Sequence, residues 1–198
     1  MPARETLWDA LHARGRPVHA CWFCAGPEHF AAVTASVATR AVDAGEWVHI
    51  LAPPAFIQAL TSALGELRAP LLRLVEDSGI SGAELRRLAS DWRPGSWIIH
   101  VVGNPPAPAT VPSGVWAAKT TLLRARATAR ERVLERLTEA GLVRCLCVYD
   151  VCGVPAWEAD LVAESHHRWV ACEARLLPIN EVLAGVPPVA TPPPAPAH

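Results

Sequence analysis

Short apolar runs alternate along the chain with longer segments in which apolar residues recur at helical spacing. The first apolar run, Val18 to Cys24, has few polar positions, which is typical of a strand that is buried on both faces. A helix is predicted after it, from about Glu28 to Ala44, because its apolar residues lie mostly three or four positions apart and Gly45 follows as a stop.

The later elements repeat this alternation. Ser81 and Glu84 form a capping-box pattern that starts one of the helices. Further strands are predicted over Trp47 to Leu51, Leu71 to Val75 (an edge strand), Trp97 to Val102, Leu142 to Asp150 and, as a strand or strand pair, Arg168 to Pro178. Further helices are predicted over Glu5 to Arg14, Ala55 to Leu67, Ser81 to about Trp92, Ser113 to about Ala140 and Pro155 to His167.

Strands that alternate with helices of ten or more residues indicate a mostly parallel, doubly wound sheet with helices on both faces, which is a three-layer α/β fold. In such folds, ligands bind beyond the carboxyl ends of the strands. The predicted fold therefore points to four short segments before any motif is considered. They are Phe23 to Gly26, Ala52-Pro53, Gly103-Asn104 and Tyr149-Asp150.

The composition narrows the class of protein. Of the 198 residues 51% are hydrophobic, but no run approaches the ~18 apolar residues of a transmembrane helix. The opening segment carries charges of both signs, unlike a signal peptide, so a cytosolic protein is expected. The net charge of −1 supplies no basic surface for nucleic acid. The predicted division is a lead-in helix (1–16), one domain (17–185) and a disordered proline-rich tail (186–198).

The turn after the first strand, Cys24 to Glu28, lies where a phosphate loop would lie. A phosphate loop needs several backbone N–H groups, a lysine and a Ser or Thr. This turn has one glycine and none of those side chains, Pro27 removes an N–H group, and Glu28 adds negative charge where an anion would bind. Nucleotide hydrolysis is therefore disfavoured, and a RecA-like ATPase with a divergent phosphate loop stays open only as an alternative.

Six cysteines in a cytosolic chain favour buried thiols over disulfides. Cys21 and Cys24 lie three positions apart on the first strand, so they are expected to point to opposite faces and not to share a metal. Cys145 and Cys147 do share a strand face. A metal- or haem-binding regulatory protein that combines cysteines with histidines is the second alternative. Its candidate ligands are Cys21, Cys145, Cys147, Cys152, His19, His166 and His167.

Four segments, taken in order, are similar to a known family: HACWFCAGPEHF, WVHILAP, WIIHVVGN and LVRCLCVYDVCGVPAWEADLVAESHH. Over about residues 17 to 178, the chain resembles the MEDS domain, the sensory domain of the dichloromethane-responsive regulator of methylotrophs. The most specific pieces are His19 to Phe23 and Cys147 to Asp150, with a histidine near the end of the following helix.

The resemblance implies a RecA-like fold without a working phosphate loop and a non-catalytic role in sensing small molecules, hydrocarbon derivatives among them. We therefore expect a small apolar organic ligand, no cofactor, and signalling or transcriptional regulation through a separate protein partner. The implied site positions are His19, Cys21, Cys24, Tyr149, Asp150 and His166, and the position of strand ends adds Asn104.

Overall fold

The sheet of the protein has seven strands in the order β3-β2-β4-β5-β1-β6-β7. The computed structural model describes residues 11, 18–65, 70–77, 80–102, 113–150, 170–172 and 175–177. Side chains are described in all of these ranges except 113–124, 170–172 and 175–177. The pairings are parallel except that of β6 with β7. The strands are β1 (His19–Cys24), β2 (Val48–Ala52), β3 (Leu72–Glu76), β4 (Ser96–Val102), β5 (Val143–Asp150), β6 (Val170–Cys172) and β7 (Arg175–Leu177).

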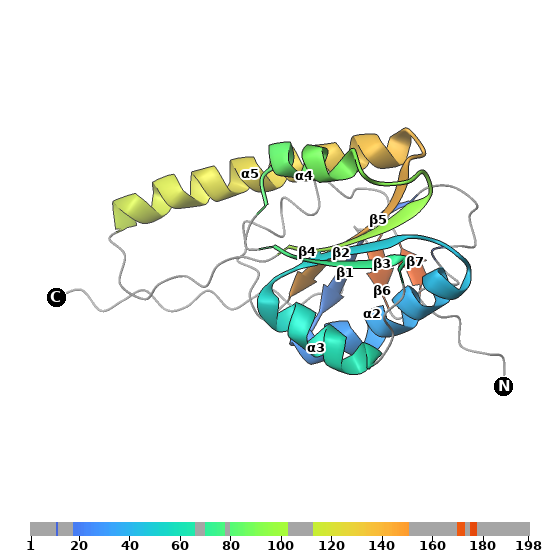
Figure 1. Ribbon diagram of the computed structural model, residues 1–198. Helices are drawn as coiled ribbons and strands as arrows, with labels where there is room; N and C mark the ends of the chain where they lie inside the picture. Colours follow the sequence, from blue (N-terminus) through green and yellow to red (C-terminus); the bar gives the residue numbers. More distant parts are fainter. Residues whose placement is uncertain are drawn as a thin grey trace.

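Helices cover both faces of this sheet (Figure 1). Helices α2 (Gly26–Asp43) and α3 (Pro54–Leu64) lie on one face, and α4 (Gly82–Ala89) and α5 (Ser113–Glu139) lie on the other. The predicted fold class, a three-layer α/β architecture with a mostly parallel sheet, is confirmed. Strand β1 lies inside the sheet, between β5 and β6.

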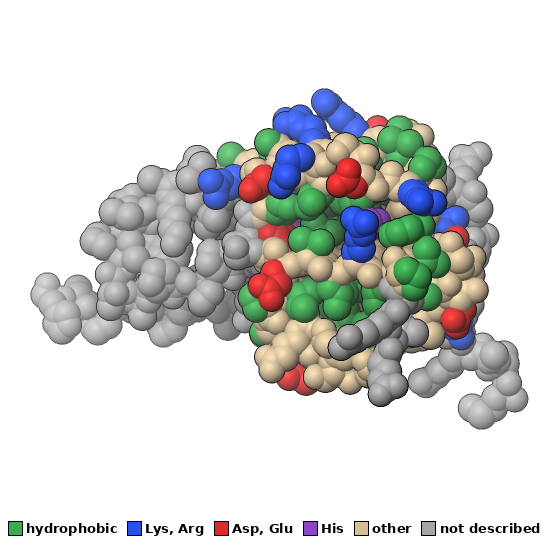
Figure 2. All heavy atoms as spheres, viewed as in Figure 1, with side chains coloured by type: hydrophobic (Ala, Val, Ile, Leu, Met, Phe, Trp, Pro, Cys, Tyr) green, Lys and Arg blue, Asp and Glu red, His purple; other side chains and the backbone are tan. Residues whose placement is uncertain are grey.

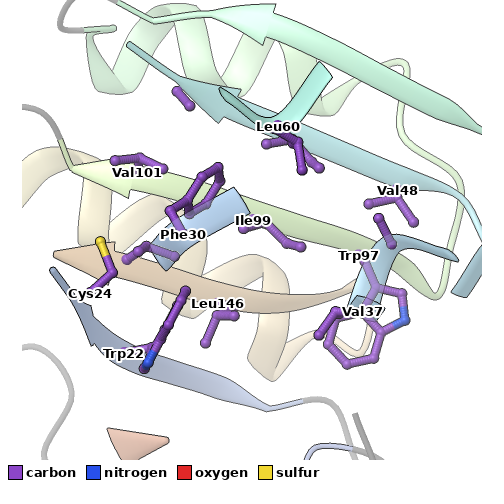
Figure 3. Packing of buried hydrophobic residues seen from close by; sticks show 14 of the residues in the cluster. Trp22, Cys24, Phe30, Val37, Val48, Leu60, Trp97, Ile99, Val101 and Leu146 are labelled. Carbon is purple, nitrogen blue, oxygen red and sulfur yellow. The ribbon is translucent and has the colours of Figure 1, made fainter. Parts of the chain in front are cut away.

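The face of the sheet under α2 and α3 forms an apolar core. Figure 3 shows the side chains of Phe30 and Leu60, one from each helix, lying together with Ile99 of β4. Phe30 also meets Phe56 of α3 edge-on, with ring centroids 5.3 Å apart. This apolar contact holds the two helices against the strands.

Side chains alternate between the two faces along each strand, and this separates the first two cysteines as predicted. Cys24 belongs to the core under α2 and α3, whereas Cys21 belongs to the cluster under α4 and α5. Cys145 and Cys147, two positions apart on β5, both join Cys21 on the α4–α5 face.

Local sequence signals also fix where the helices begin and end. Ser81 caps α4, because its hydroxyl accepts a hydrogen bond from the Glu84 N–H at 3.2 Å and the Glu84 carboxylate accepts one from the Ser81 N–H at 2.9 Å. The predicted capping box is thus confirmed. Helix α3 ends at Leu64, earlier than the predicted Leu67, because Gly65 follows with a φ of +60°.

Strand β3 lies at the edge of the sheet, as predicted, and the segment predicted as a strand or strand pair contains β6 and β7. The predicted helix over 155–167 and the tail over 186–198 lie outside the described residues. Of the predicted helix over 5–14, the structure describes only Leu11, which is helical and buried. Within the described ranges, no helix combines the length and hydropathy of a membrane span.

The surface over α4 and α5 carries most of the basic side chains visible in Figure 2, with acidic side chains between them. Exposed Arg86 and Arg87 come from α4, and exposed Arg126 and Arg132 come from α5. The charges on the visible face are therefore mixed in sign, in keeping with the net charge of −1.

Replacing Leu60 by alanine should lower the free energy of unfolding by about 2–5 kcal/mol, because a fully buried leucine leaves a cavity. Urea denaturation of the full chain measures the change. The matched control is Gln58→Ala at an exposed position of the same helix, which should change stability by less than about 0.5 kcal/mol. Equal losses in the two variants would contradict the packing of α3 on the sheet.

Candidate functional site

The face of the sheet under α4 and α5 carries ionisable side chains from three neighbouring strands. The strand register places His19 beside Cys145, and Cys21 beside Cys147. On the other side of β5, His100 of β4 also pairs with Cys147. Residues paired in adjacent parallel strands point to the same face, so this layer of the core is polar in its centre.

Glu131 of α5 enters this layer from above and is only 2% exposed. Its Oε2 lies 3.3 Å from His19 Nε2 and accepts a hydrogen bond from the Cys147 thiol at 3.4 Å. Its Oε1 accepts a hydrogen bond from the Tyr149 hydroxyl at 3.2 Å. His19 Nε2 also lies 3.3 Å from Cys147 Sγ. We call His19, Glu131, Cys145, Cys147 and Tyr149 the polar cluster.

Burial and charge together set the protonation states in the polar cluster. Burial by itself lowers the pKa of His19, but the neighbouring Cys147 and Glu131 outweigh it and raise the pKa to about 10. Burial raises the pKa of the Cys147 thiol and of the Tyr149 hydroxyl well above their usual values. Burial therefore favours the neutral thiol of Cys147 and the neutral phenol of Tyr149 in this cluster.

A buried pair of a histidine and an aspartate, His100 and Asp77, lies next to the polar cluster. His100 Nε2 lies 2.8 Å from Asp77 Oδ2, and both side chains are buried. Asp77 is held in turn by the Ile80 N–H, which donates to its other oxygen. Burial lowers the pKa of His100 despite the hydrogen bond to Asp77, so His100 is neutral at physiological pH. Among the described residues, neither His100 Nδ1 nor Arg130 Nε has a hydrogen-bond partner.

Several of these atoms have the spacing of metal ligands. The donor atoms of His19, Cys145 and Cys147 all lie within 4.8 Å of one another, and so do those of His100, Glu131 and Cys147. The sulfurs of Cys145 and Cys147 are 3.7 Å apart, and neither cysteine forms a disulfide. The other ligands considered from the sequence, Cys152, His166 and His167, lie outside the described residues.

The turn between β1 and α2 is a separate site at the carboxyl end of the sheet. Gly26, with a φ of +85°, donates its N–H to Asp150 Oδ1 at 3.2 Å. The Ala25 N–H donates to His29 Nδ1 at 3.0 Å. Pro27 has no N–H, and Glu28 adds negative charge in the first turn of α2. A carboxylate of the chain itself therefore occupies the place where a phosphate loop would hold an anion.

The structure divides the residues that the sequence singled out. His19, Cys21 and Tyr149 lie on the α4–α5 face, where His19 and Tyr149 contact Glu131. Cys24 is fully buried on the opposite face, in the apolar core with Phe30. Asp150 is paired in register with Cys24 and holds the turn. Asn104 and His166 lie outside the described residues.

Three residues of this layer, Glu131, His100 and Asp77, were not among those predicted from the sequence. A signal for Glu131 was present, because its spacing from buried Ala127, Leu134 and Thr138 puts it on the inward stripe of α5. An acidic residue on the buried stripe of a helix needs a partner on the facing sheet. No comparable signal existed for His100 and Asp77, which meet across β2 from distant parts of the chain.

No profile of a known protein family matches the chain, and no curated protein sequence matches it. Among solved structures, the chain is similar to the ATPase domain of a helicase, with a TM-score of 0.39 and 13% sequence identity over 76% of this chain. The match covers 61% of that protein's own chain. At this similarity no residue role is transferred. Fold and site together define an α/β domain with an ionisable cluster buried under α5.

Replacing Tyr149 by phenylalanine should lower the free energy of unfolding by about 1.5–3 kcal/mol, because a buried carboxylate loses a hydrogen-bond donor. In the background of Glu131→Gln the same replacement should cost less, since the acceptor no longer carries a charge. A double-mutant cycle, measured by urea denaturation with a chelator present, gives the coupling between the two side chains. Strictly additive losses would show that the hydroxyl does not stabilise the Glu131 carboxylate.

Proposed function

We propose that the chain is a non-catalytic sensory domain of the MEDS type, which binds a small apolar organic molecule in the cytosol. Binding at the carboxyl ends of β1 and β5 alters a contact with a separate regulatory protein. The resemblance over residues 17 to 178 supports the family, and the three-layer fold supports a site at the strand ends.

One observation carries this proposal: the Asp150 carboxylate accepts the hydrogen bond of the Gly26 N–H. In P-loop nucleotide-binding proteins, the corresponding N–H groups hold phosphate. Here Asp150 and Glu28 place negative charge beside the start of α2, so a nucleotide phosphate would meet repulsion instead of a cradle. This charge arrangement favours an uncharged ligand over ATP.

The adjacent positions of Tyr149 and Asp150 suggest how binding would be transmitted. Asp150 holds the turn at the strand end, and Tyr149 hydrogen-bonds to Glu131 in the middle of the α4–α5 layer. A ligand that displaces the Asp150 carboxylate would shift the end of β5 and so the contact between Tyr149 and α5. Helix α5 then presents the change on the outer surface of the domain, where a partner protein would detect it.

Isothermal titration of the full chain with Mg·ATP, Mg·ADP and inorganic phosphate should give no saturable heat. The Asp150→Asn variant keeps a hydrogen-bond acceptor for Gly26 but loses the charge. This variant should also fail to bind nucleotide, because the turn still lacks the lysine and the hydroxyl of a phosphate loop. Saturable binding of Mg·ATP to the unmodified chain would contradict the proposal and restore the ATPase alternative.

A thermal-shift screen with small apolar molecules, dichloromethane among them, tests the positive half of the proposal. A ligand that binds the folded state raises the unfolding midpoint. At a free ligand concentration of 100 times Kd, it raises the free energy of unfolding by about 2.7 kcal/mol. We expect a concentration-dependent rise that is reduced in Asp150→Asn and kept in Asp91→Asn, an exposed control. Identical shifts in both variants, or no shift with any molecule of this class, would contradict a ligand site at the strand end.

A further inference from the structure

We propose that His19, Cys145, Cys147 and Glu131 bind a zinc ion in tetrahedral geometry under helix α5. This zinc centre lies within the α4–α5 layer, whereas the proposed sensory ligand binds at the turn after β1. The inference therefore does not depend on the proposed function.

The types of donor atom suit zinc. The polar cluster offers one imidazole nitrogen, two thiolate sulfurs and one carboxylate oxygen. Zinc takes nitrogen, sulfur and oxygen ligands, and its structural sites are almost always four-coordinate. Calcium and magnesium prefer oxygen ligands alone, so the two sulfurs of Cys145 and Cys147 argue against them.

Four of the six distances between these donors agree with the edges of a tetrahedron around zinc, and the Cys145 sulfur lies within 4.8 Å of the His19 donor nitrogen. Zinc bonds of about 2.3 Å to sulfur and about 2.0–2.2 Å to nitrogen and oxygen separate two sulfurs by about 3.8 Å, sulfur from nitrogen or oxygen by about 3.5 Å, and nitrogen from oxygen by about 3.4 Å. The two sulfurs are 3.7 Å apart. Cys147 Sγ lies 3.3 Å from His19 Nε2 and 3.4 Å from Glu131 Oε2. His19 Nε2 and Glu131 Oε2 are 3.3 Å apart.

The surroundings hold these donors in place. Cys145 and Cys147 lie two positions apart on β5, so their thiols face the same side of the sheet. The register of the neighbouring strand β1 places His19 beside Cys145. Tyr149 donates to the second oxygen of Glu131 and so leaves Oε2 directed at Cys147 and His19. Such outer hydrogen bonds orient metal ligands. The His19 side chain is 9% exposed and Glu131 2%, so water competes little for the ion.

Zinc binding replaces protons in this cluster. A cysteine binds metal as the thiolate and a histidine as the neutral ring, so any proton on these groups is released to solvent when zinc binds. The ion with two thiolates and one carboxylate then carries a net charge of −1. The other ionisable groups in the same layer are Cys21, Asp77, His100, Arg130 and Tyr149.

Cobalt(II) replaces zinc and reports the ligands by absorption, so it tests the proposal on the full chain. The protein is purified under reducing conditions, stripped with a chelator and titrated with Co²⁺. We expect one equivalent to give a thiolate-to-cobalt charge-transfer band and the intense visible bands of tetrahedral cobalt, and Zn²⁺ to abolish both. No charge-transfer band in the unmodified chain would overturn the proposal.

The cysteines of the two sheet faces provide a matched pair of variants. Cys147→Ala and Cys24→Ala each remove one sulfur from a fully buried position. Cys147→Ala should weaken zinc binding, measured by competition with a chromophoric chelator, by more than the ~10–100-fold that loss of an outer-shell partner causes. Cys24→Ala should bind as the unmodified chain does. Equal affinity in Cys147→Ala and the unmodified chain would overturn the proposal.

If circular dichroism shows that Cys147→Ala does not fold, His19→Ala takes its place. His19 is the first residue of β1, so its replacement should disturb the sheet less than a change in the middle of β5. This variant should keep the thiolate-to-cobalt band at reduced affinity, and unchanged affinity would exclude His19 as a ligand and contradict the proposed centre. None of these results bears on the strand-end ligand, so failure of the zinc centre and failure of the sensory function are distinguishable.

Discussion

The buried carboxylate of Glu131 is the interaction on which the centre of this structure depends. An ionised carboxylate taken out of water costs several kcal/mol unless partners surround it. Here His19, Cys147 and Tyr149 surround it, and they come from β1 and β5. The charge of Glu131 therefore fixes α5 over these two strands, because any shift of the helix would leave a buried charge without partners.

The alternation of side chains along parallel strands gives the two faces of the sheet different chemistry. The face under α2 and α3 is a conventional apolar core that includes Cys24 and Phe30. The face under α4 and α5 gathers the ionisable side chains. The carboxyl end of β5 connects the two layers, since Tyr149 joins the polar cluster and Asp150 joins the turn before α2. A single strand thus links a surface turn to a buried centre.

Most of the fold could be predicted from local patterns, because apolar periodicity and capping signals act within a few residues. The strands around Cys21 and Cys147, the opposite directions of Cys21 and Cys24, and the capping box at Ser81 were all predicted correctly. The site was predicted only in part. The contacts of Glu131 depend on how α5 crosses the sheet, and the pairing of His100 with Asp77 depends on the strand order. Spacing along the chain determines neither of these arrangements.

The proposed zinc centre distinguishes the polar cluster from an ordinary polar patch in the core, because two of its donors are sulfur. X-ray absorption at the zinc edge, on the zinc-loaded full chain, counts those donors directly. We expect two sulfurs at about 2.3 Å from zinc and two nitrogen or oxygen atoms at about 2.0–2.2 Å. A shell of nitrogen and oxygen alone would contradict the proposed centre, because zinc would then be bound elsewhere on the protein.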